Sequence, residues 1–360
     1  MRTVKVPLAE RSYPIRIGAE LLAELGKQCA QLRLGKRCAV ISDANVSRRY
    51  RKRTLDSLKN AGFEPIFISQ NAGEKSKTLK NVRACYEQLA KHRLERGSFL
   101  VALGGGVVGD LGGFVAATYL RGIDFVQVPT TLLAQVDSSV GGKVGVNLPA
   151  GKNLVGAFYQ PKLVLCDLET LRTLPTREFR AGLAEVIKYG IIYDAKLFAR
   201  LERELPKLLK YDTETLATVV ARCCQIKAEV VCQDEKENGL RAILNFGHTI
   251  GHGLEAISRY GKHLHGEAIS IGQMATAKIS HAVSGLPATH LTRMKTLFTQ
   301  AGLPTQVKLT TAQTRDLFAA MKLDKKVRGG KIQFVLAKEI GRVVTGQNVT
   351  DKVIRQSLLD

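Results

Sequence analysis

The sequence contains no tryptophan, few aromatic residues, and no CxxC pair among its seven cysteines. Zinc knuckles and disulfide frameworks need cysteines at paired spacings, so the odd count and the adjacent Cys223 and Cys224 predict reduced thiols without a chemical role. No apolar run reaches the roughly 20 residues that span a membrane, and the start of the chain lacks the apolar stretch of a signal peptide. We therefore expect a cytoplasmic protein without membrane contact.

Acidic residues are scarce, because 32 Asp and Glu stand against 54 Lys and Arg, giving a net charge of +22. Such a charge suits nucleic acid, an anionic membrane surface or phosphate-bearing small molecules. The densest basic run, residues 48–53, is interpreted as a solvated helix face, since the chain has neither aromatic-rich basic strands nor zinc-finger spacings for nucleic-acid readout. We expect a small-molecule ligand and no nucleic acid.

The order of apolar segments predicts two domains in a chain long enough for two cores. In the first part, a short strand pair is followed by strands that alternate with helices, which favours an α/β domain with a mostly parallel, Rossmann-like sheet. After the polar, Pro-containing connection near residue 172 the pattern is mainly helical. We expect an α/β domain over 1–172 and a mainly α-helical domain over 173–360. The main predicted strands are 37–43, 64–69, 98–106, 124–130, 162–167, 331–337 and 342–346.

A glycine-rich turn lies between a predicted strand and a predicted helix. Gly104, Gly106 and Gly109 satisfy GxGxxG, and small residues there let backbone N–H groups approach a diphosphate. Asp110 follows the turn directly, in place of an acidic residue after a second strand, so we expect a nucleotide bound in a geometry unlike that of an ordinary Rossmann dehydrogenase. Farther along, the Gly- and Lys-containing segment 141–153 is either an anion cradle or a flexible surface loop.

Four of the seven histidines lie within residues 244–267. His248 and His252, four residues apart, share one face of a predicted helix with Glu255. A catalytic zinc site uses three nitrogen or oxygen ligands and keeps one position open, and HxxxH spacing alone would name His248 and His252 as ligands. The third ligand would then be a carboxylate, for which Glu185 is the candidate. Because Lys188 lies three residues later, an exposed Glu–Lys helix pair is an equally good interpretation.

Taken together, the motifs GGGVVGD, VPTTLLAQVDSSVGGKVGVN, GKNLVGAFYQP, REFRAGLAEVIKYG, LNFGHTIGH and HGEAISIG occur in this order. From Ser42 to Phe334 the chain resembles the 3-dehydroquinate synthase family. The resemblance implies a lyase of the shikimate pathway that converts 3-deoxy-D-arabino-heptulosonate 7-phosphate into 3-dehydroquinate and phosphate. It also implies NAD and one divalent metal as cofactors, with zinc first and cobalt second, a homodimer, and an active site between the two domains.

The resemblance also assigns residues by motif. Glu185, His248 and His265 become the metal ligands, and His252 moves to a substrate-side role near the phosphate. The NAD positions are Asp43, Asn45, Glu74, Lys77, Gly105, Gly106, Val107, Asp110, Thr130, Thr131, Asp137, Lys143, Lys152, Thr170 and Thr173. The catalytic positions are Lys143, Lys188, Lys236, Arg241, Asn245 and His252. The substrate positions are Arg121 (toward the neighbouring subunit), Asp137, Asn153, Lys188, Lys236, Arg241, Asn245, His252 and Lys326, which is favoured over Lys325.

Two other enzyme classes stay open. Another sugar-phosphate cyclase would share the metal and NAD machinery, although Arg241, Asn245 and His252 together favour dehydroquinate as the product. A metal-dependent polyol dehydrogenase would also combine a glycine turn with metal-binding histidines, but it would form NADH in net amounts. A basic nucleic-acid-binding protein ranks far below both, because only the arginine run supports it.

Overall fold

The computed structural model describes residues 1–237, 239–258, 263–322, 327–328 and 331–359. The chain forms two compact units. The first comprises residues 1–174 and 216–236, and the second comprises 175–215 and 237–360. The sequence-based boundary near residue 172 assigned all later residues to one domain, whereas residues 216–236 belong to the first compact unit. The domain division itself stays a prediction.

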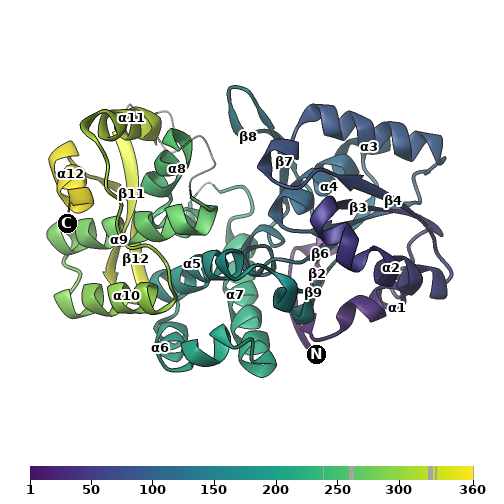
Figure 1. The fold of residues 1–360 in the computed structure, drawn as a ribbon, viewed down its shortest axis with the longest axis horizontal. Helices are drawn as coiled ribbons and strands as arrows, with labels where there is room; N and C mark the ends of the chain where they lie inside the picture. The colour runs from purple at the N-terminus through teal and green to yellow at the C-terminus, as the bar shows by residue number, and fades with distance from the viewer. Residues whose placement is uncertain (238, 259–262, 323–326, 329–330, 360) are drawn as a thin grey trace. The chain divides into compact units, whose positions relative to one another are not determined.

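The first unit is built on a seven-stranded sheet with the order β1-β2-β9-β6-β5-β3-β4. Figure 1 labels several of these strands and the helices of the same unit. Strand β1 pairs antiparallel with β2, and the other neighbouring strands pair in parallel, as the continuous apolar runs predicted. The strands are β1 (Arg2–Val6), β2 (Tyr13–Gly18), β3 (Arg37–Asp43), β4 (Glu64–Gln70), β5 (Phe99–Gly104), β6 (Asp124–Pro129) and β9 (Leu163–Asp167).

Helices cover both faces of this sheet because alternate strand residues point to opposite sides. On β3, Ala39 and Ile41 join a core with helices α3 (Leu79–Lys91) and α4 (Gly106–Thr118). Cys38 and Val40 join a second core with α1 (Leu25–Ala30) and α2 (Ala44–Asn60). This arrangement leaves the carboxyl ends of the parallel strands as the place where a ligand can bind.

Segment 141–153 is not a flexible loop. It contributes to an antiparallel hairpin of β7 (Lys143–Leu148) and β8 (Gly151–Phe158). Alternate residues of KVGVNL point to one side of the hairpin, and Val144 and Val146 lie in the core that residues of α3 and α4 also form. A Cβ on Gly113 of α4 would lie 2.4 Å from Val144, so only glycine lets the helix pack this closely on the hairpin.

The rest of the first unit consists of short helical segments and one long helix. Helix α7 (Thr213–Gln233) belongs to this unit from Leu216 onward. The short segments are η1 (Ala9–Arg11), η2 (Leu21–Glu24), η3 (Glu74–Ser76), η4 (Tyr119–Arg121), the π-helical η5 (Ala134–Ser138) and η6 (Leu168–Thr173).

The second unit is mainly helical, as predicted. Its core joins α8, α9 and α11 to strand β11 through Ile250, Leu254, Ile271, Leu317 and Phe334. A three-stranded antiparallel sheet, β10-β11-β12, accompanies the helices. Its elements are α5 (Thr176–Ile192), α6 (Ala195–Leu209), η7 (Leu240–Asn245), α8 (His248–Ile257), α9 (His265–Ser284), α10 (Ala288–Gln300), α11 (Thr311–Lys322), β10 (Val327–Arg328), β11 (Lys331–Glu339), β12 (Arg342–Asn348) and α12 (Asp351–Leu359). Among the described residues, no helix is long and apolar enough to cross a membrane.

Candidate active site

Helix α5 carries a buried carboxylate in the second unit. Glu185 has no exposed surface, and Lys188, one turn later, is 1% exposed. The ammonium of Lys188 forms an ion pair with the carboxylate of Glu185. The interpretation of these residues as an exposed helix pair is therefore wrong. Burial of a charged group is costly unless ion pairs, hydrogen bonds or a metal compensate it, and the ammonium of Lys188 compensates the charge of Glu185 on one side.

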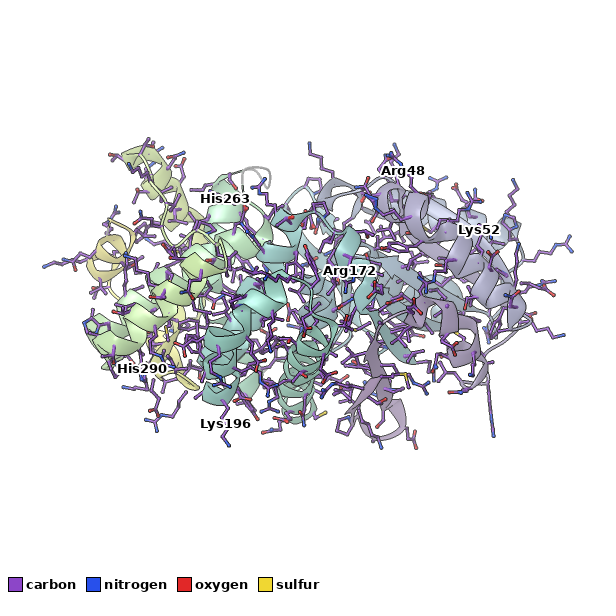
Figure 2. The ribbon with its side chains drawn as sticks, turned by 60° about the horizontal axis from the view of Figure 1, so that its bottom comes forward. Arg48, Lys52, Arg172, Lys196, His263 and His290 are labelled. Atoms are coloured by element: carbon purple, nitrogen blue, oxygen red, sulfur yellow. The ribbon has the colours of Figure 1, made fainter. Side chains whose placement is uncertain are left out.

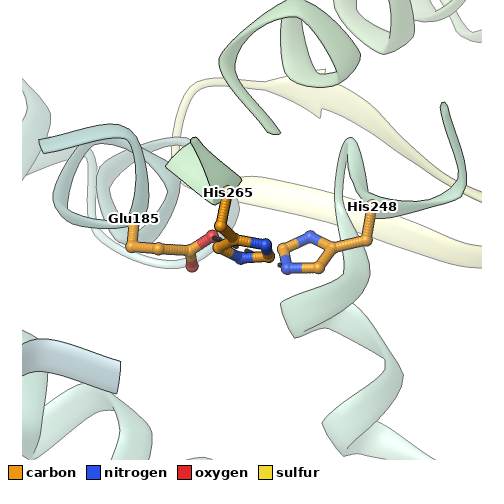
Figure 3. A group of neighbouring side chains, drawn as sticks. All are labelled: Glu185, His248 and His265. Carbon is orange, nitrogen blue, oxygen red and sulfur yellow. Dashed lines mark ion pairs between the residues drawn. The ribbon is translucent and has the colours of Figure 1, made fainter. Parts of the chain in front are cut away.

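Two imidazoles face Glu185 (Figure 3). The Nε2 atom of His248, at the start of α8, lies 3.6 Å from Oε1 of Glu185. The Nε2 atom of His265, at the start of α9, lies 3.8 Å from the same oxygen. The three residues together form a group whose potential ligand atoms lie within 4.8 Å of one another. Residues that are 63 and 80 positions from Glu185 in the sequence thus converge on one point.

The donor set suits a zinc-type ion. Ligand atoms about 2.0–2.1 Å from a tetrahedral Zn²⁺ are separated from one another by about 3.4 Å, close to the 3.6 and 3.8 Å between Oε1 of Glu185 and the two Nε2 atoms. Oε2 of Glu185 contacts the ammonium of Lys188, and no other described group donates a hydrogen bond to either carboxylate oxygen. The buried oxygen Oε1, which faces both imidazoles and has no hydrogen-bond donor, calls for an explanation such as a metal ion, and one carboxylate with two imidazoles matches the ligands of catalytic zinc.

Both imidazoles have an acceptor near their second nitrogen. Nδ1 of His248 lies 3.2 Å from the carbonyl oxygen of Phe246. Nδ1 of His265 lies 3.2 Å from Oε2 of Glu255. When Nδ1 carries the proton and donates it to such an acceptor, the lone pair of Nε2 is left available for a metal.

His252 belongs to the same cluster, with its ring centroid 5.2 Å from that of His248 and 6.1 Å from that of His265. His252, Glu255 and His265 form a second group with metal-ligand spacing. The buried oxygen Oε1 of Glu185, which has no hydrogen-bond donor within the described chain, favours the group of Glu185. The assignment of His252 to the substrate side is kept as a prediction.

The predicted nucleotide turn lies at the carboxyl end of β5 in the first unit. Helix α4 begins at Gly106 after the N-cap Gly105, and no side chain caps its first turn. The backbone N–H groups of that turn can therefore bind a phosphate oxygen. Asp110 accepts a 2.5 Å hydrogen bond from Lys77, which is 3% exposed. Burial raises the pKa of the Asp110 carboxyl, and the ammonium of Lys77 opposes this effect.

Other predicted NAD residues have structural partners of their own. Asp43 caps α2 by accepting from the backbone N–H groups of Asn45 and Val46. Thr130 and Thr131 follow β6, and the backbone N–H of Thr130 donates to the carbonyl of Gly104 at 2.9 Å. The remaining predicted positions outside the hairpin lie in short helical segments or next to the turn: Glu74 in η3, Val107 in α4, Asp137 in η5, and Thr170 and Thr173 in η6.

The hairpin carries three of the predicted binding residues. Lys143 is exposed at the start of β7, and Lys152 and Asn153 lie on β8. Asn153 has a left-handed backbone, with φ of 53°, and its N–H donates to Oδ1 of Asn147 at 2.9 Å. The neighbouring amide of Asn147 donates to Glu74, which ties the hairpin to η3.

The sequence reasoning missed one candidate site residue, Lys227. The side chain of Lys227, on α7, is 8% exposed. It donates 2.6 and 2.5 Å hydrogen bonds to the backbone oxygen and to Oδ1 of Asp137, a predicted NAD and substrate residue. The predicted residue Lys236 is instead exposed. The available signal was a lysine between apolar residues in QIKAEVV, which is unusual on a buried helix.

The predicted substrate residues of the second unit differ in their surroundings. Arg241 is 2% exposed in η7, and the side-chain amide of Asn245 donates to Glu237 at 2.9 Å. Lys188 lies beside Glu185. Lys325 and Lys326 lie outside the described residues. Arg121, predicted to reach a neighbouring subunit, is exposed in η4 of the first unit and has a φ of 69°.

The basic run on α2 forms an exposed helix face, on which Arg48 and Lys52 lie at the surface (Figure 2). Several of its cations have partners within the first unit. Lys52 pairs with Asp56 at 2.6 Å, and the guanidinium of Arg51 lies 5.1 Å from the ring centre of Phe67. These contacts agree with the interpretation of the run as a solvated helix face.

Comparison with known proteins identifies relatives over nearly the whole chain. Residues 67–181 match the N-terminal family of 3-dehydroquinate synthase, and residues 182–327 match its C-terminal family. The 3-dehydroquinate synthase of Nostoc punctiforme is 49% identical over 99% of this chain and 98% of its own. That of Desulforamulus reducens is 49% identical over 95% of both chains.

Solved structures are also similar to this chain over nearly its whole length. The 2-epi-5-epi-valiolone synthase of Streptomyces hygroscopicus, with NAD⁺ and Zn²⁺ bound, is 29% identical over 96% of each chain, with a TM-score of 0.88. A 2-deoxy-scyllo-inosose synthase with carbaglucose-6-phosphate, NAD⁺ and Co²⁺ is 27% identical over 99% of each chain, with a TM-score of 0.91. An NADH-dependent butanol dehydrogenase of Thermotoga maritima, 15% identical over 96% of this chain and 95% of its own, with a TM-score of 0.68, shares the fold alone. The chain belongs to the 3-dehydroquinate synthase family.

Proposed function

We propose that this chain is a lyase that converts 3-deoxy-D-arabino-heptulosonate 7-phosphate into 3-dehydroquinate and phosphate. Identity of 49% over nearly full length to enzymes of that name supports this substrate above those of the cyclases, which are 27–29% identical. The structural observation that carries the proposal is the convergence of Glu185, His248 and His265.

We propose NAD and one divalent metal as cofactors, zinc first and cobalt second. Glu185, His248 and His265 would hold the metal, which would supply Lewis-acid polarisation of a substrate oxygen. The uncapped N-terminus of α4 and the predicted residues around it would bind NAD, which supplies a reversible hydride acceptor. Because the family's reaction returns the hydride, NAD would be needed only in catalytic amounts.

The remaining site residues bind and orient charged groups of the substrate. Lys143, Lys188 and Arg241 suit a carboxylate and a phosphate, and arginine can bind either with two parallel hydrogen bonds. Asn245 offers a side-chain amide, and His252 offers an imidazole beside His248 and His265, as hydrogen-bonding groups. Lys227 would fix the carboxylate of Asp137, to which it is hydrogen-bonded.

A phosphate-release assay tests the proposal. It uses the heptulosonate phosphate, a catalytic amount of NAD and added zinc, while absorbance reports NADH. The expected result is phosphate release without net NADH, abolished by a chelator and restored by metal. Release from sugar 6-phosphates but not from the heptulosonate would favour another cyclase. NADH accumulation with simple polyols would favour a dehydrogenase and contradict the substrate assignments.

We further propose a homodimer in the cytoplasm, with Arg121 directed at the phosphate in the neighbouring subunit. Exposed apolar side chains in the first unit support a partner surface: Leu120, next to Arg121, is 40% exposed, and Leu154 and Phe158 of β8 are 45% and 44% exposed. Sedimentation equilibrium would give the mass of a dimer. Mixing an inactive Arg121→Ala chain with an inactive Glu185→Ala chain would restore part of the activity if Arg121 acts across subunits.

A further inference from the structure

We propose that Glu255 is a positioning residue that holds the metal ligand His265 in the tautomer and orientation that metal binding needs. The proposal rests on the metal-dependent function above. Glu255 lies on α8, its side chain is 7% exposed, and its Oε2 lies 3.2 Å from Nδ1 of His265. Nothing in the proposed reaction uses this carboxylate directly, so its burial needs another reason.

The two nitrogens of His265 face different carboxylates. Nε2 faces Oε1 of Glu185 at 3.8 Å, and Nδ1 faces Oε2 of Glu255 at 3.2 Å. A metal bound through Nε2 requires the proton to be on Nδ1, where it is donated to Glu255. The carboxylate would thereby fix the ring and increase the electron density that the imidazole offers to the metal.

The two histidine ligands are supported unequally. Nδ1 of His248 has a neutral acceptor, the carbonyl oxygen of Phe246, at 3.2 Å. Nδ1 of His265 has the carboxylate of Glu255. His265 is also the more accessible ligand, with its side chain 30% exposed against 10% for His248. Packing restrains His265 less than His248, and the hydrogen-bond acceptor next to Nδ1 of His265 is the stronger one, a carboxylate.

We assign Glu255 to support a metal ligand, and not to bind the metal itself, because the hydrogen-bond partners of its carboxylate differ from those of Glu185. Oε2 of Glu255 is within hydrogen-bond distance of His265, whereas Oε1 of the buried Glu185, on the side away from the Lys188 contact at Oε2, has no hydrogen bond within the described chain. A metal in the alternative group of His252, Glu255 and His265 would leave the buried oxygen Oε1 of Glu185 without a partner. The geometry therefore places the metal at Glu185 and the supporting hydrogen bond at Glu255.

The test measures metal affinity, apart from turnover. Metal-free wild type and Glu255→Gln are titrated with Zn²⁺ against a chromophoric chelator, and the visible spectrum of bound Co²⁺ is recorded for each. Gln keeps the size of the side chain and an acceptor oxygen but loses the charge. The control is Glu202→Gln, which removes a carboxylate charge elsewhere in the same unit, where Glu202 binds Arg293 at 2.9 and 2.6 Å.

We expect Glu255→Gln to bind Zn²⁺ about 10- to 100-fold more weakly than wild type and to shift the Co²⁺ spectrum, while Glu202→Gln changes neither. The thermal midpoint of metal-free Glu255→Gln should stay close to that of Glu202→Gln, which separates positioning from a general loss of packing. Wild-type affinity and an unchanged Co²⁺ spectrum in Glu255→Gln would overturn the positioning role but leave the proposed function intact.

Two further outcomes would also overturn it. If His252→Ala loses the metal while His248→Ala keeps it, Glu255 is itself a ligand. If the wild-type chain binds neither Zn²⁺ nor Co²⁺, the metal-dependent function fails, and the role of Glu255 fails with it.

Discussion

Replacing Lys227 by methionine should destabilise the first unit through the loss of one buried cation. The variant keeps the apolar stem but removes both hydrogen bonds to Asp137, at 2.6 and 2.5 Å. The side chains of Lys227 and Asp137 are 8% and 23% exposed, so water replaces the lost ammonium only in part. Breaking a well-buried pair costs about 3–5 kcal/mol, and the partial exposure of Asp137 places the expected loss near the lower limit, about 3 kcal/mol.

The carboxylate part of this interaction can be isolated by a double-mutant cycle with Asp137→Asn, because the bond to the backbone oxygen persists in that variant. We expect a coupling energy of about 1.5–3 kcal/mol, the range for a hydrogen bond to a charged group. The matched control is the pair of Lys52 and Asp56, which has a similar length of 2.6 Å but a lysine that is 91% exposed. Exposed helix pairs of this spacing contribute about 0.3–0.5 kcal/mol.

Urea unfolding of the four chains in each cycle, followed by circular dichroism, gives these energies. Activity measured on the same variants shows whether the position of Asp137 also matters for turnover. A coupling energy at Lys227 and Asp137 no larger than that of the exposed control pair would refute the argument that burial makes this interaction strong.

Three other predictions concern the metal, pH and thiols. Glu185→Ala should lose bound metal and activity together, whereas His252→Ala should keep its metal and turn over slowly. Metal analysis and the phosphate-release assay check both results. A fully metallated, active Glu185→Ala chain would contradict the ligand assignment. Burial alone would raise the pKa of Glu267, but hydrogen bonds from Arg177 and from the backbone of Leu264 lower it below its ordinary 4.5. A lowered pKa stabilises the fold above pH 4.5 and loses this effect as pH falls through the folded-state pKa, so thermal midpoints should separate wild type from Glu267→Gln at neutral pH and converge on acidification; a constant difference would contradict this. Burial raises the pKa of Cys29 to about 12 and of Cys85 to about 11, so a thiol reagent at mildly alkaline pH should reach them only after unfolding, and fast labelling of the native chain at either residue would contradict that.

Much of the fold could be predicted because its signals are local. Continuous apolar runs such as 99–104 identified the parallel strands, and glycines after them identified the turn before α4. The hairpin of β7 and β8 was missed as a definite element because its glycines and lysines resemble a loop. Its strand character depends on Val144 and Val146 packing under distant helices, which no short window of sequence contains.

Part of the candidate site could likewise be predicted from the sequence, and part of it could not. Spacing placed His248, His252 and Glu255 on one helix face, and the search for a carboxylate named Glu185 as a candidate ligand. Motif resemblance then favoured Glu185 as a ligand and replaced His252 with His265. Spacing could not decide whether Glu185 was exposed, because an amphipathic pattern does not show which neighbouring helix covers a given face. The same limit hid the ion pair between Lys227 and Asp137, which joins residues 90 positions apart.

The sequence alone determined the class of sheet, the helical second part, the types of ligand residue and the family. Only the tertiary structure decided that Glu185 is buried beside Lys188, that Nε2 of His248 and His265 face its Oε1, and that Glu255 lies next to Nδ1 of His265. The physical reason is that periodicity records the local geometry of each helix and strand. The burial and contacts of a charged side chain depend on packing between elements that are far apart in the chain.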